Sequence, residues 1–254
     1  MTTIRTIIVL TLFFVLTSSL LAKPIVFGTQ EFPPFSQTKS GKVVGPGVDV
    51  IAAVMKRAGL DYKIKSGVWK WIQKSAKDKN GDVSALFFIG KNAAREKWLN
   101  FSPPILETTY GFFAKKSSRI KYSNDVPLVN SSIGVYGPSN TSKNLAKIRK
   151  KPGNDFKTEL YKDSVTVFRV LGRGSNLKFA FSNGDVGRAI IKDEGLDNLQ
   201  YVGTFKKLNY YFGFSKMKID AATTKKIMDA YKSLIADGSI ARILAGYNMT
   251  PAAK

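Results

Sequence analysis

The sequence contains neither cysteine nor histidine, and these two absences exclude several classes of function. Without cysteine the chain has no disulfide framework, no thiol nucleophile and no thiolate metal site. Without histidine it lacks the commonest general base and the commonest metal ligand, so Ser-His-Asp and Cys-His catalysis are both excluded. The two absences favour a binding protein over an enzyme and predict that the protein uses no metal or other cofactor.

Acidic residues are also scarce. The chain has 18 Asp and Glu against 40 Lys and Arg, which gives a formal net charge of +22. Such a surface can attract anionic lipids, cell-wall polymers or nucleic acids, and steep loss of binding with salt would reveal that function. The basic residues are scattered, however, so we interpret them as a solvated lysine-rich surface and predict no nucleic-acid partner. Their short clusters are Lys115-Lys116, Arg149–Lys151, Lys206-Lys207 and Lys225-Lys226.

Long apolar runs are absent except at the start of the chain. Met1–Arg5 carries a positive charge, Thr6–Leu21 is almost wholly apolar or hydroxylated, and Ala22 is a small residue before polar sequence begins at Lys23. This order of segments is typical of a secretory signal peptide, and the apolar run is shorter than the ~20 residues that a spanning helix needs. We therefore predict that residues 1–22 are removed and that the protein is secreted to the periplasm.

The remaining sequence alternates between strand-like and helix-like patterns, which predicts parallel α/β sheets, and its length allows two small lobes. Strands are expected at Ile25–Gly28, Tyr62–Ile64, Val83–Ile89, Thr109–Ala114, Ile133–Tyr136, Val165–Phe168, Val186–Ile191 and Tyr210–Phe214. Helices are expected at Val48–Ala58, Trp69–Lys79, Ala93–Trp98, Thr141–Lys150, Leu177–Ser182, the amphipathic run that follows Asp220, and Ile240–Leu244.

Ligands of such sheets bind outside the carboxyl ends of the strands, so the loops there are the candidate binding segments. They are 29–35, 67–71, 89–95 and 137–141. In the last of these, Ser139, Asn140 and Thr141 follow a strand and open a helix. Hydroxyl and free backbone N–H groups at a helix start suit an anionic group, although they also fit a plain helix cap.

Five segments, taken in order, resemble those of the family 3 extracellular solute-binding proteins, the periplasmic amino-acid receptors of ABC importers. The resemblance extends from Ile25 to Tyr247. The segments are Phe27-Gly28-Thr29 to Pro33-Pro34-Phe35, Gly41–Gly45 with Val48-Asp49-Val50, Trp69 thirteen residues before Asp82, Arg95 with Phe101-Ser102 and Pro104, and Asp237-Gly238-Ser239-Ile240.

The resemblance implies the two-lobed type II periplasmic-binding fold, in which each lobe is a mostly parallel sheet flanked by helices. Two crossings, expected near Phe112–Lys116 and Thr204–Tyr210, would join the lobes and act as a hinge. Residues 23–112 plus 209–254 would form lobe 1 and residues 113–208 lobe 2. We expect the protein to be a monomer.

The resemblance also assigns roles to individual residues. Arg95 would grip a ligand carboxylate, for which the fork of a guanidinium is well suited. Phe32 and Trp69 match the aromatic positions that pack on either side of the ligand, with Trp71 as a possible substitute for Trp69. Gln30 and Glu31 would contact the distal end of the ligand.

Several positions depart from the pattern of the family. Asn92 replaces a threonine, and Phe87 and Phe88 replace small residues that are often serine. Gly90 lies five residues before Arg95, and we include it among the expected ligand contacts.

The most important departure concerns the second-lobe aspartate that holds the α-amino group in the family. We place that position at Gly187. Asp185, two residues earlier, would lie on the same face of a strand and is expected to take over. Glu31 is the other acidic candidate for a ligand cation.

We therefore predict a non-catalytic periplasmic solute-binding protein that closes on a small carboxylate-bearing ligand, such as an amino acid or a derivative, for the permease of an ABC importer. One alternative keeps the fold and delivers the signal to a membrane sensor. Another is a dehydratase-like enzyme on the same fold, with Glu31 and Glu107 as acid and base.

Overall fold

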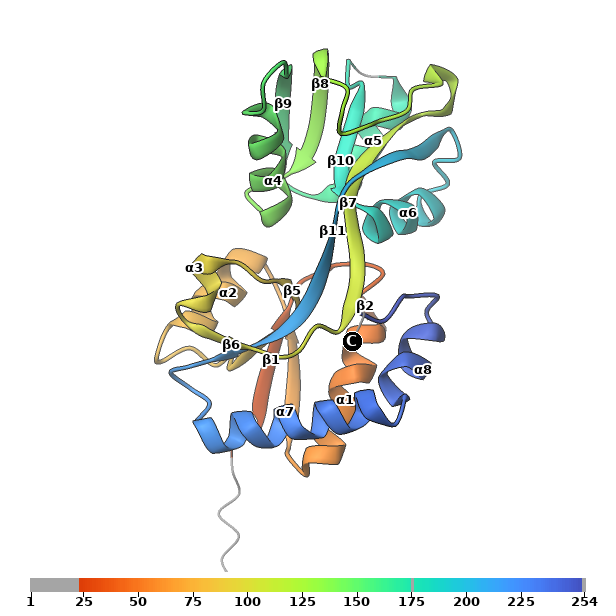
Figure 1. Cartoon of the computed structure of the whole chain (residues 1–254). Helices are drawn as coiled ribbons and strands as arrows, with labels where there is room; N and C mark the ends of the chain where they lie inside the picture. Colours follow the sequence, from red (N-terminus) through yellow and green to blue (C-terminus); the bar gives the residue numbers. More distant parts are fainter. Residues whose placement is uncertain (1–22, 175, 253–254) are drawn as a thin grey trace, which may run out of the picture.

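The computed structural model describes residues 23–174 and 176–252, so the predicted signal peptide lies outside the described residues. The described part has two lobes joined by two long strands (Figure 1). These strands, β7 (Leu106–Lys115) and β11 (Leu199–Ser215), pair antiparallel along most of their lengths. Across the described residues, no helix combines the length and the apolar character that crossing a membrane requires.

Lobe 1 is the lower group of elements in Figure 1. In its sheet, β1 pairs in parallel with β4 and β5, and β5 and β6 pair antiparallel with β11. Its strands are β1 (Ile25–Thr29), β4 (Tyr62–Ser66), β5 (Ala85–Gly90) and β6 (Leu99–Phe101). Its helices are α1 (Pro46–Ala58), α2 (Trp69–Lys77), α3 (Ala93–Glu96), α7 (Ala221–Ala236) and α8 (Ser239–Ala245).

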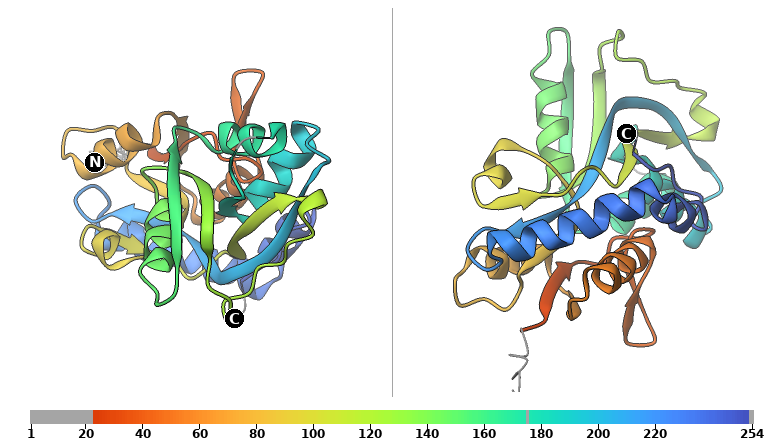
Figure 2. Two further views of the ribbon diagram at one scale, coloured as in Figure 1. Left: turned by 90° about the horizontal axis from the view of Figure 1, so that it is seen from above. Right: turned by 60° about the horizontal axis from the view of Figure 1, so that its bottom comes forward.

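A separate two-stranded hairpin projects from lobe 1, as Figure 2 shows. It consists of β2 (Gln37–Lys39) and β3 (Lys42–Val44), which pair antiparallel. The hairpin includes most of the segment Gly41–Gly45, one of the five that carry the family resemblance.

Lobe 2 is the upper group of elements in Figure 1. Its central strand β8 pairs in parallel with β9 and β10, and β10 pairs antiparallel with β7. The elements are β8 (Val129–Tyr136), β9 (Asp155–Tyr161), β10 (Phe179–Asn183), α4 (Asn140–Arg149), α5 (Ser164–Arg173), α6 (Gly184–Asp193) and the short 3-10 helix η1 (Lys116–Ser118). Together the lobes form the expected two-lobed α/β architecture.

Three of the predicted elements in lobe 2 are wrong. The segments 165–168 and 186–191, predicted as strands, belong to helices α5 and α6, and the segment 177–182, predicted as a helix, is mostly strand β10. Short apolar runs carry no clear period, so they fit a buried strand and a buried helix equally well. The apolar segment of α5 begins after Asp163, whose carboxylate accepts a hydrogen bond from the Thr166 backbone N–H at 2.7 Å. This helix cap favours a helix over a strand for the segment.

The core of lobe 1 joins distant parts of the chain. The apolar face of α1, including Val50 and Ile51, packs in one buried cluster with Ile227 and Tyr231 of α7. The Tyr231 hydroxyl is satisfied because it donates a hydrogen bond to the Pro104 carbonyl at 2.9 Å. The first and last segments of the described chain therefore stabilise the same lobe, while the middle segment forms the other.

The crossing strands approach each other very closely. A Cβ atom at Gly111 of β7 would lie 2.4 Å from the Gly203 carbonyl of β11, so only glycine fits there.

The place where β7 passes between the lobes follows from its pairing, because Tyr110–Phe113 already pair with β10 of lobe 2. We therefore propose that the crossing in β7 lies before Tyr110, slightly earlier than the sequence suggests.

Candidate functional site

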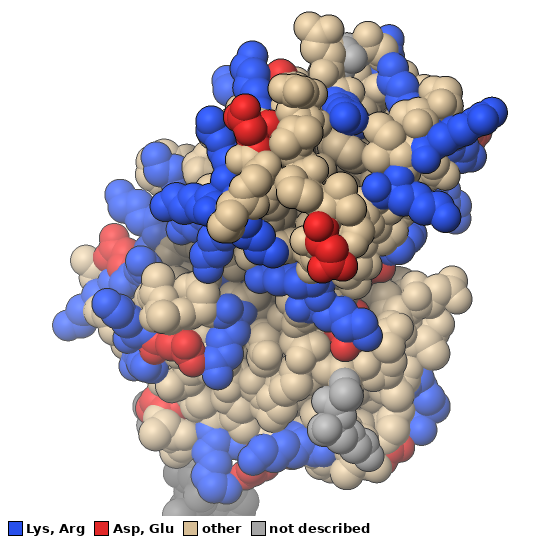
Figure 3. Space-filling view, turned by 45° about the horizontal axis from the view of Figure 1, so that its top comes forward, with Lys and Arg blue, Asp and Glu red and all other residues tan. Residues whose placement is uncertain are grey.

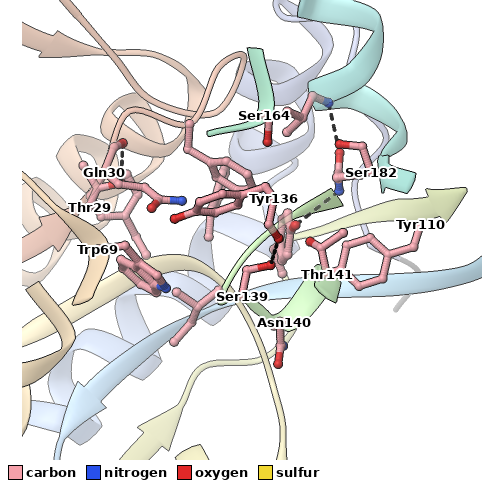
Figure 4. Close-up of a pocket in the computed structure, with 18 of the residues that line it drawn as sticks. Thr29, Gln30, Trp69, Tyr110, Tyr136, Ser139, Asn140, Thr141, Ser164 and Ser182 are labelled. Carbon is pink, nitrogen blue, oxygen red and sulfur yellow. Dashed lines mark hydrogen bonds between the residues drawn. The ribbon is translucent and has the colours of Figure 1, made fainter. Parts of the chain in front are cut away.

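A small cavity of about 70 Å³ lies between the lobes, at the ends of strands from both of them. From lobe 1 it is reached by Thr29 at the end of β1 and Gly90 at the end of β5. From lobe 2 it is reached by Tyr136 at the end of β8 and Ser182 near the end of β10. Figure 4 shows residues of the two lobes on opposite sides of this space, which is where the sheet topology predicts a ligand.

Arg95 is held in place by both the backbone and a neighbouring side chain. Asn92 caps α3 by accepting a hydrogen bond from the Arg95 backbone N–H at 3.0 Å. The guanidinium donates from Nη1 to the Gly90 carbonyl at 2.7 Å and from Nη2 to Gln73 Oε1 at 3.2 Å. The other N–H groups of the guanidinium remain available at the cavity, so the group is oriented before a ligand arrives.

The charge of Arg95 has no counter-ion among the residues that the structure describes. No described carboxylate lies within 4.0 Å of it, and the residues that line the cavity include no Asp or Glu. Burial lowers the pKa of Arg95, although a guanidinium still keeps its proton at neutral pH. A desolvated and unpaired cation is costly, so the cavity favours an anionic group.

The two predicted aromatic residues both line this cavity. Trp69 lies with its ring centroid 5.7 Å from the Arg95 guanidinium carbon, and Phe32 packs against Tyr210 with ring centroids 5.9 Å apart. Trp71 points elsewhere, because it is 58% exposed with Lys70 and Lys74 near its ring. The structure thus places Trp69, and not its possible substitute, at the candidate site.

The serine and asparagine side chains at the start of α4 are mostly used within the protein. Ser139 caps the helix, accepting from the Ser142 backbone N–H at 3.1 Å and donating to the Tyr136 carbonyl at 2.7 Å. Asn140 accepts a hydrogen bond from Asn92 of lobe 1 at 3.3 Å, so this contact crosses the cleft. What α4 offers a ligand is chiefly the backbone N–H groups of Asn140 and Thr141, because those of Ser142 and Lys143 already donate to Ser139.

A buried network behind the cavity was not identified from the sequence. The Asn183 amide nitrogen donates to Thr108 Oγ1 at 2.7 Å and to the Tyr210 hydroxyl at 3.2 Å. Tyr210 also interacts with Tyr110, which hydrogen-bonds Thr141. Burial raises the pKa of both tyrosines, so both stay neutral phenols at physiological pH.

Further lining residues were missed as well. Tyr136 was identifiable as the end of a predicted strand, whereas the helix assigned over 177–182 hid Ser182 and Asn183. Ser164 was hidden in the same way, because it begins a helix that was predicted as a strand. The missed lining residues that bear polar groups are Thr29, Tyr110, Tyr136, Ser164, Ser182, Asn183 and Tyr210.

Two acidic residues that we expected at the ligand do not line the cavity. Glu31 lies on an adjoining outer cavity of about 720 Å³ and accepts hydrogen bonds from the Thr38 backbone N–H at 3.0 and 3.1 Å. Asp185 accepts from Thr108 Oγ1 at 2.6 Å and lies 3.7 Å from Arg188.

The reasoning that placed Asp185 on a strand face is wrong, because Asp185 begins helix α6. Gly187 belongs to the same helix and is packed against Phe113 and Phe168, so it does not face the ligand. In addition, no three described His, Cys, Asp or Glu residues are grouped so that they could hold a metal ion.

Comparisons with known proteins agree with this geometry. The sequence profile of the bacterial extracellular solute-binding proteins, family 3, matches residues 25–250. A probable histidine-binding protein of Neisseria gonorrhoeae is 23% identical over 224 residues, which cover 87% of this chain and 81% of that protein. These relatives are described as binding proteins and not as enzymes.

Solved structures confirm the predicted fold class. The arginine-, lysine-, histidine-binding protein ArtJ of Geobacillus stearothermophilus is 27% identical, with a TM-score of 0.71 and coverage of 87% of this chain and 93% of that chain. A histidine kinase sensor domain with similarity to periplasmic binding proteins has a TM-score of 0.76 at 20% identity, covering 91% and 98% of the two chains. At that identity the second likeness concerns the fold alone.

Proposed function

This chain belongs to the bacterial extracellular solute-binding proteins of family 3, and we propose that it captures a small carboxylate-bearing molecule in the cleft between its lobes. The observation that carries the proposal is the isolated charge of Arg95. Among the described residues, Arg95 is the only charged side chain that lines the cavity and has no carboxylate partner within 4.0 Å, and Gly90 and Gln73 anchor it. A bidentate ligand carboxylate would provide the missing counter-ion.

The rest of the ligand would be neutral or anionic. The relatives named above bind histidine, arginine or lysine, whose basic side chains or α-ammonium groups need acceptors. This cavity offers no carboxylate for such a group, and the Asn183 amide oxygen already accepts from the backbone N–H groups of Asp185 and Val186 at 2.9 and 3.0 Å. Neutral hydroxyl and carbonyl groups are the acceptors that remain. We therefore propose that recognition depends on the carboxylate and much less on an ammonium.

Binding would proceed by closure of the lobes and not by catalysis. Ligand groups that contact Arg95 on lobe 1 and the α4 amides on lobe 2 favour the closed arrangement over an open one. We propose that the protein acts as a monomer in the periplasm and that the permease of an ABC importer reads the closed form. A membrane sensor would use the same closure, as the likeness in fold to a sensor domain illustrates.

The test is thermal unfolding of the chain from Lys23 onward in the presence of a panel of carboxylates, each compared with its amide and its α-amino derivative. A ligand that binds only the folded state stabilises it by ~2.7 kcal/mol at a hundredfold excess over its dissociation constant. We expect the midpoint to rise with at least one carboxylate and not with the matching amide.

The Arg95→Gln variant should lose this rise, whereas Arg149→Gln, which removes an exposed arginine outside the cavity, should keep it. Arg95→Lys separates charge from geometry, because lysine cannot reproduce the two-pronged contact. A carboxylate that stabilises wild type and Arg95→Gln equally would rule out the proposed role of Arg95. Preference for the cationic amino acids would show that an ammonium is recognised after all.

A further inference from the structure

A third cavity, of about 530 Å³, adjoins the candidate site where β11 crosses between the lobes. It shares Gly90, Tyr110 and Asn140 with the Arg95 cavity, so the two spaces are neighbours in one cleft. Its lining residues come from the loop between β5 and α3, from α4 and from β11. Among them are four lysines and no acidic residue: Lys91, Lys143, Lys147 and Lys206.

The fold brings these lysines together from distant positions in the sequence. Lys143 and Lys147 lie one turn apart on α4 and therefore project from the same face of the helix. Lys206 of β11 has its Nζ 5.8 Å from the centroid of the Tyr110 ring and 5.9 Å from that of Phe205. Partial burial and the nearby charge of Lys147 both lower the pKa of Lys206.

The lysines of this cavity are short of counter-ions. Lys143, Lys147 and Lys206 form no ion pair within 4.0 Å with any described carboxylate, and Lys91 forms only an exposed pair with Glu96 at 3.1 Å. The next residue along β11 behaves differently, since Lys207 pairs with Glu107 at 2.8 Å. Figure 3 shows basic side chains gathered where the lobes meet on the side of α3 and α4, with few acidic ones among them.

We propose that this cavity binds a small oxyanion carrying two or more negative charges. Lysine ammonium groups act as point charges toward such anions, and four of them line this one open cavity. Lys91 belongs to lobe 1, whereas Lys143 and Lys147 belong to lobe 2. The bound anion would therefore bridge the lobes, and it would reduce the repulsion between the lysine charges that closure brings together. The site is distinct from the carboxylate site at Arg95, although the two cavities share three lining residues.

The experiment is calorimetric titration of pyrophosphate into the protein at constant ionic strength. The triple variant Lys143→Gln, Lys147→Gln, Lys206→Gln is compared with Lys63→Gln, Lys192→Gln, Lys226→Gln, which carries the same net charge but changes exposed lysines outside the cavity. Wild type and the control should bind one equivalent. The cavity variant should bind at least about tenfold more weakly, as the loss of several charge-assisted hydrogen bonds requires.

Equal affinity in the two triple variants, or binding without a defined stoichiometry, would overturn the proposal, because both would indicate diffuse attraction to the basic surface. The Arg95→Gln variant should bind pyrophosphate as wild type does, and loss of binding there would place the anion in the Arg95 cavity instead. Because Lys206 packs over Tyr110, the double variant Lys143→Gln, Lys147→Gln provides the same test with two exposed helix residues.

Discussion

At the scale of single residues, Asn183 explains why the cleft lacks an acidic partner. All of its amide is engaged: the oxygen accepts from the first-turn N–H groups of α6, and the nitrogen donates to Thr108 and Tyr210. A neutral amide can both donate and accept in this position, whereas a carboxylate only accepts. The side chain therefore supports the wall of the site and adds no negative charge to it.

Replacing Asn183 by Asp tests this explanation. The variant loses two donated hydrogen bonds and places a charge near Asp185, which already accepts from Thr108, so we expect unfolding to become easier by about 1–3 kcal/mol. Affinity for a carboxylate ligand should also fall. Urea unfolding and ligand titration measure the two effects, with Asn80→Asp, at an exposed position, as the control. Unchanged stability would contradict the network described for Asn183.

The residues of the site differ in how far the sequence reveals them. Arg95, Trp69 and Phe32 follow strand ends and carry distinctive chemistry, and the structure places all three at one cavity, although their role in binding stays a prediction. Tyr110 and Tyr210 were not predicted, because their hydroxyl groups reach the cavity only through the crossing of β7 and β11. No local pattern encodes a contact between residues a hundred positions apart.

At the scale of elements, helix α6 depends on a glycine where it packs against β7 and α5. A Cβ atom at Gly187 would lie 2.2 Å from Phe113 Cζ and 2.7 Å from Phe168 Cζ. We expect Gly187→Ala to destabilise the protein by about 1–3 kcal/mol in urea unfolding, despite the better helix propensity of alanine. Gly67→Ala, whose Cβ would meet Ile72 at an ordinary 3.4 Å, is the matched control. Equal midpoints for the two variants would argue against tight packing of α6.

Asp237 joins the end of α7 to α1 and gives a pH-dependent prediction. Hydrogen bonds from Ser239 and then from Arg57 lower the pKa of Asp237 to about 2, from a model-compound value of 3.8. A carboxyl group whose pKa is lower in the folded state stabilises the fold above its unfolded pKa and loses that effect as the pH falls.

The difference in thermal midpoint between wild type and Asp237→Asn should therefore be constant near neutral pH and shrink between pH 3.8 and about 2. The side chain is exposed, so the difference should be small and should weaken with salt. A difference that persists unchanged at pH 2 would mean that the lost charge is not its cause.

Helices and strands were predicted well where the apolar pattern extends over several turns, and poorly where it extends over only a few residues. Helices α1 and α7 extend over several turns, and their apolar faces specify them. The segments that became α5, β10 and α6 have only a few apolar residues each, and β10 is buried on both faces. The caps Asp163 and Asn183 were the available signals, and they outweigh the β-branched residues of the following turns.

At the scale of the whole molecule, the lobes already touch across the cleft. Asn92 of lobe 1 donates to Asn140 of lobe 2 at 3.3 Å, and a Cβ atom at Gly90 would come within 3.0 Å of the Asn140 amide nitrogen. A rotation that moves the lobes apart would break this contact. The contact therefore contributes to the equilibrium that ligand binding uses.

The Asn140→Ala variant should shift that equilibrium toward open forms. A hydrogen bond contributes about 1 kcal/mol, so ligand affinity should fall by roughly fivefold while the stability of the fold changes little. Small-angle X-ray scattering should show a larger radius of gyration for the variant without ligand. An unchanged radius together with weaker binding would mean that Asn140 contacts the ligand and does not hold the lobes together.

The two crossing strands also determine the order in which the chain can fold as it emerges. One buried cluster of lobe 2 draws its residues from 110 to 202, so it is complete before α7 leaves the ribosome. The first segment of lobe 1 emerges first, but the core of this lobe is completed last, because α1 packs against Ile227 and Tyr231 of α7. Until those two residues emerge, the apolar face of α1 stays uncovered, which makes that interval the one in which a chaperone would protect the protein most.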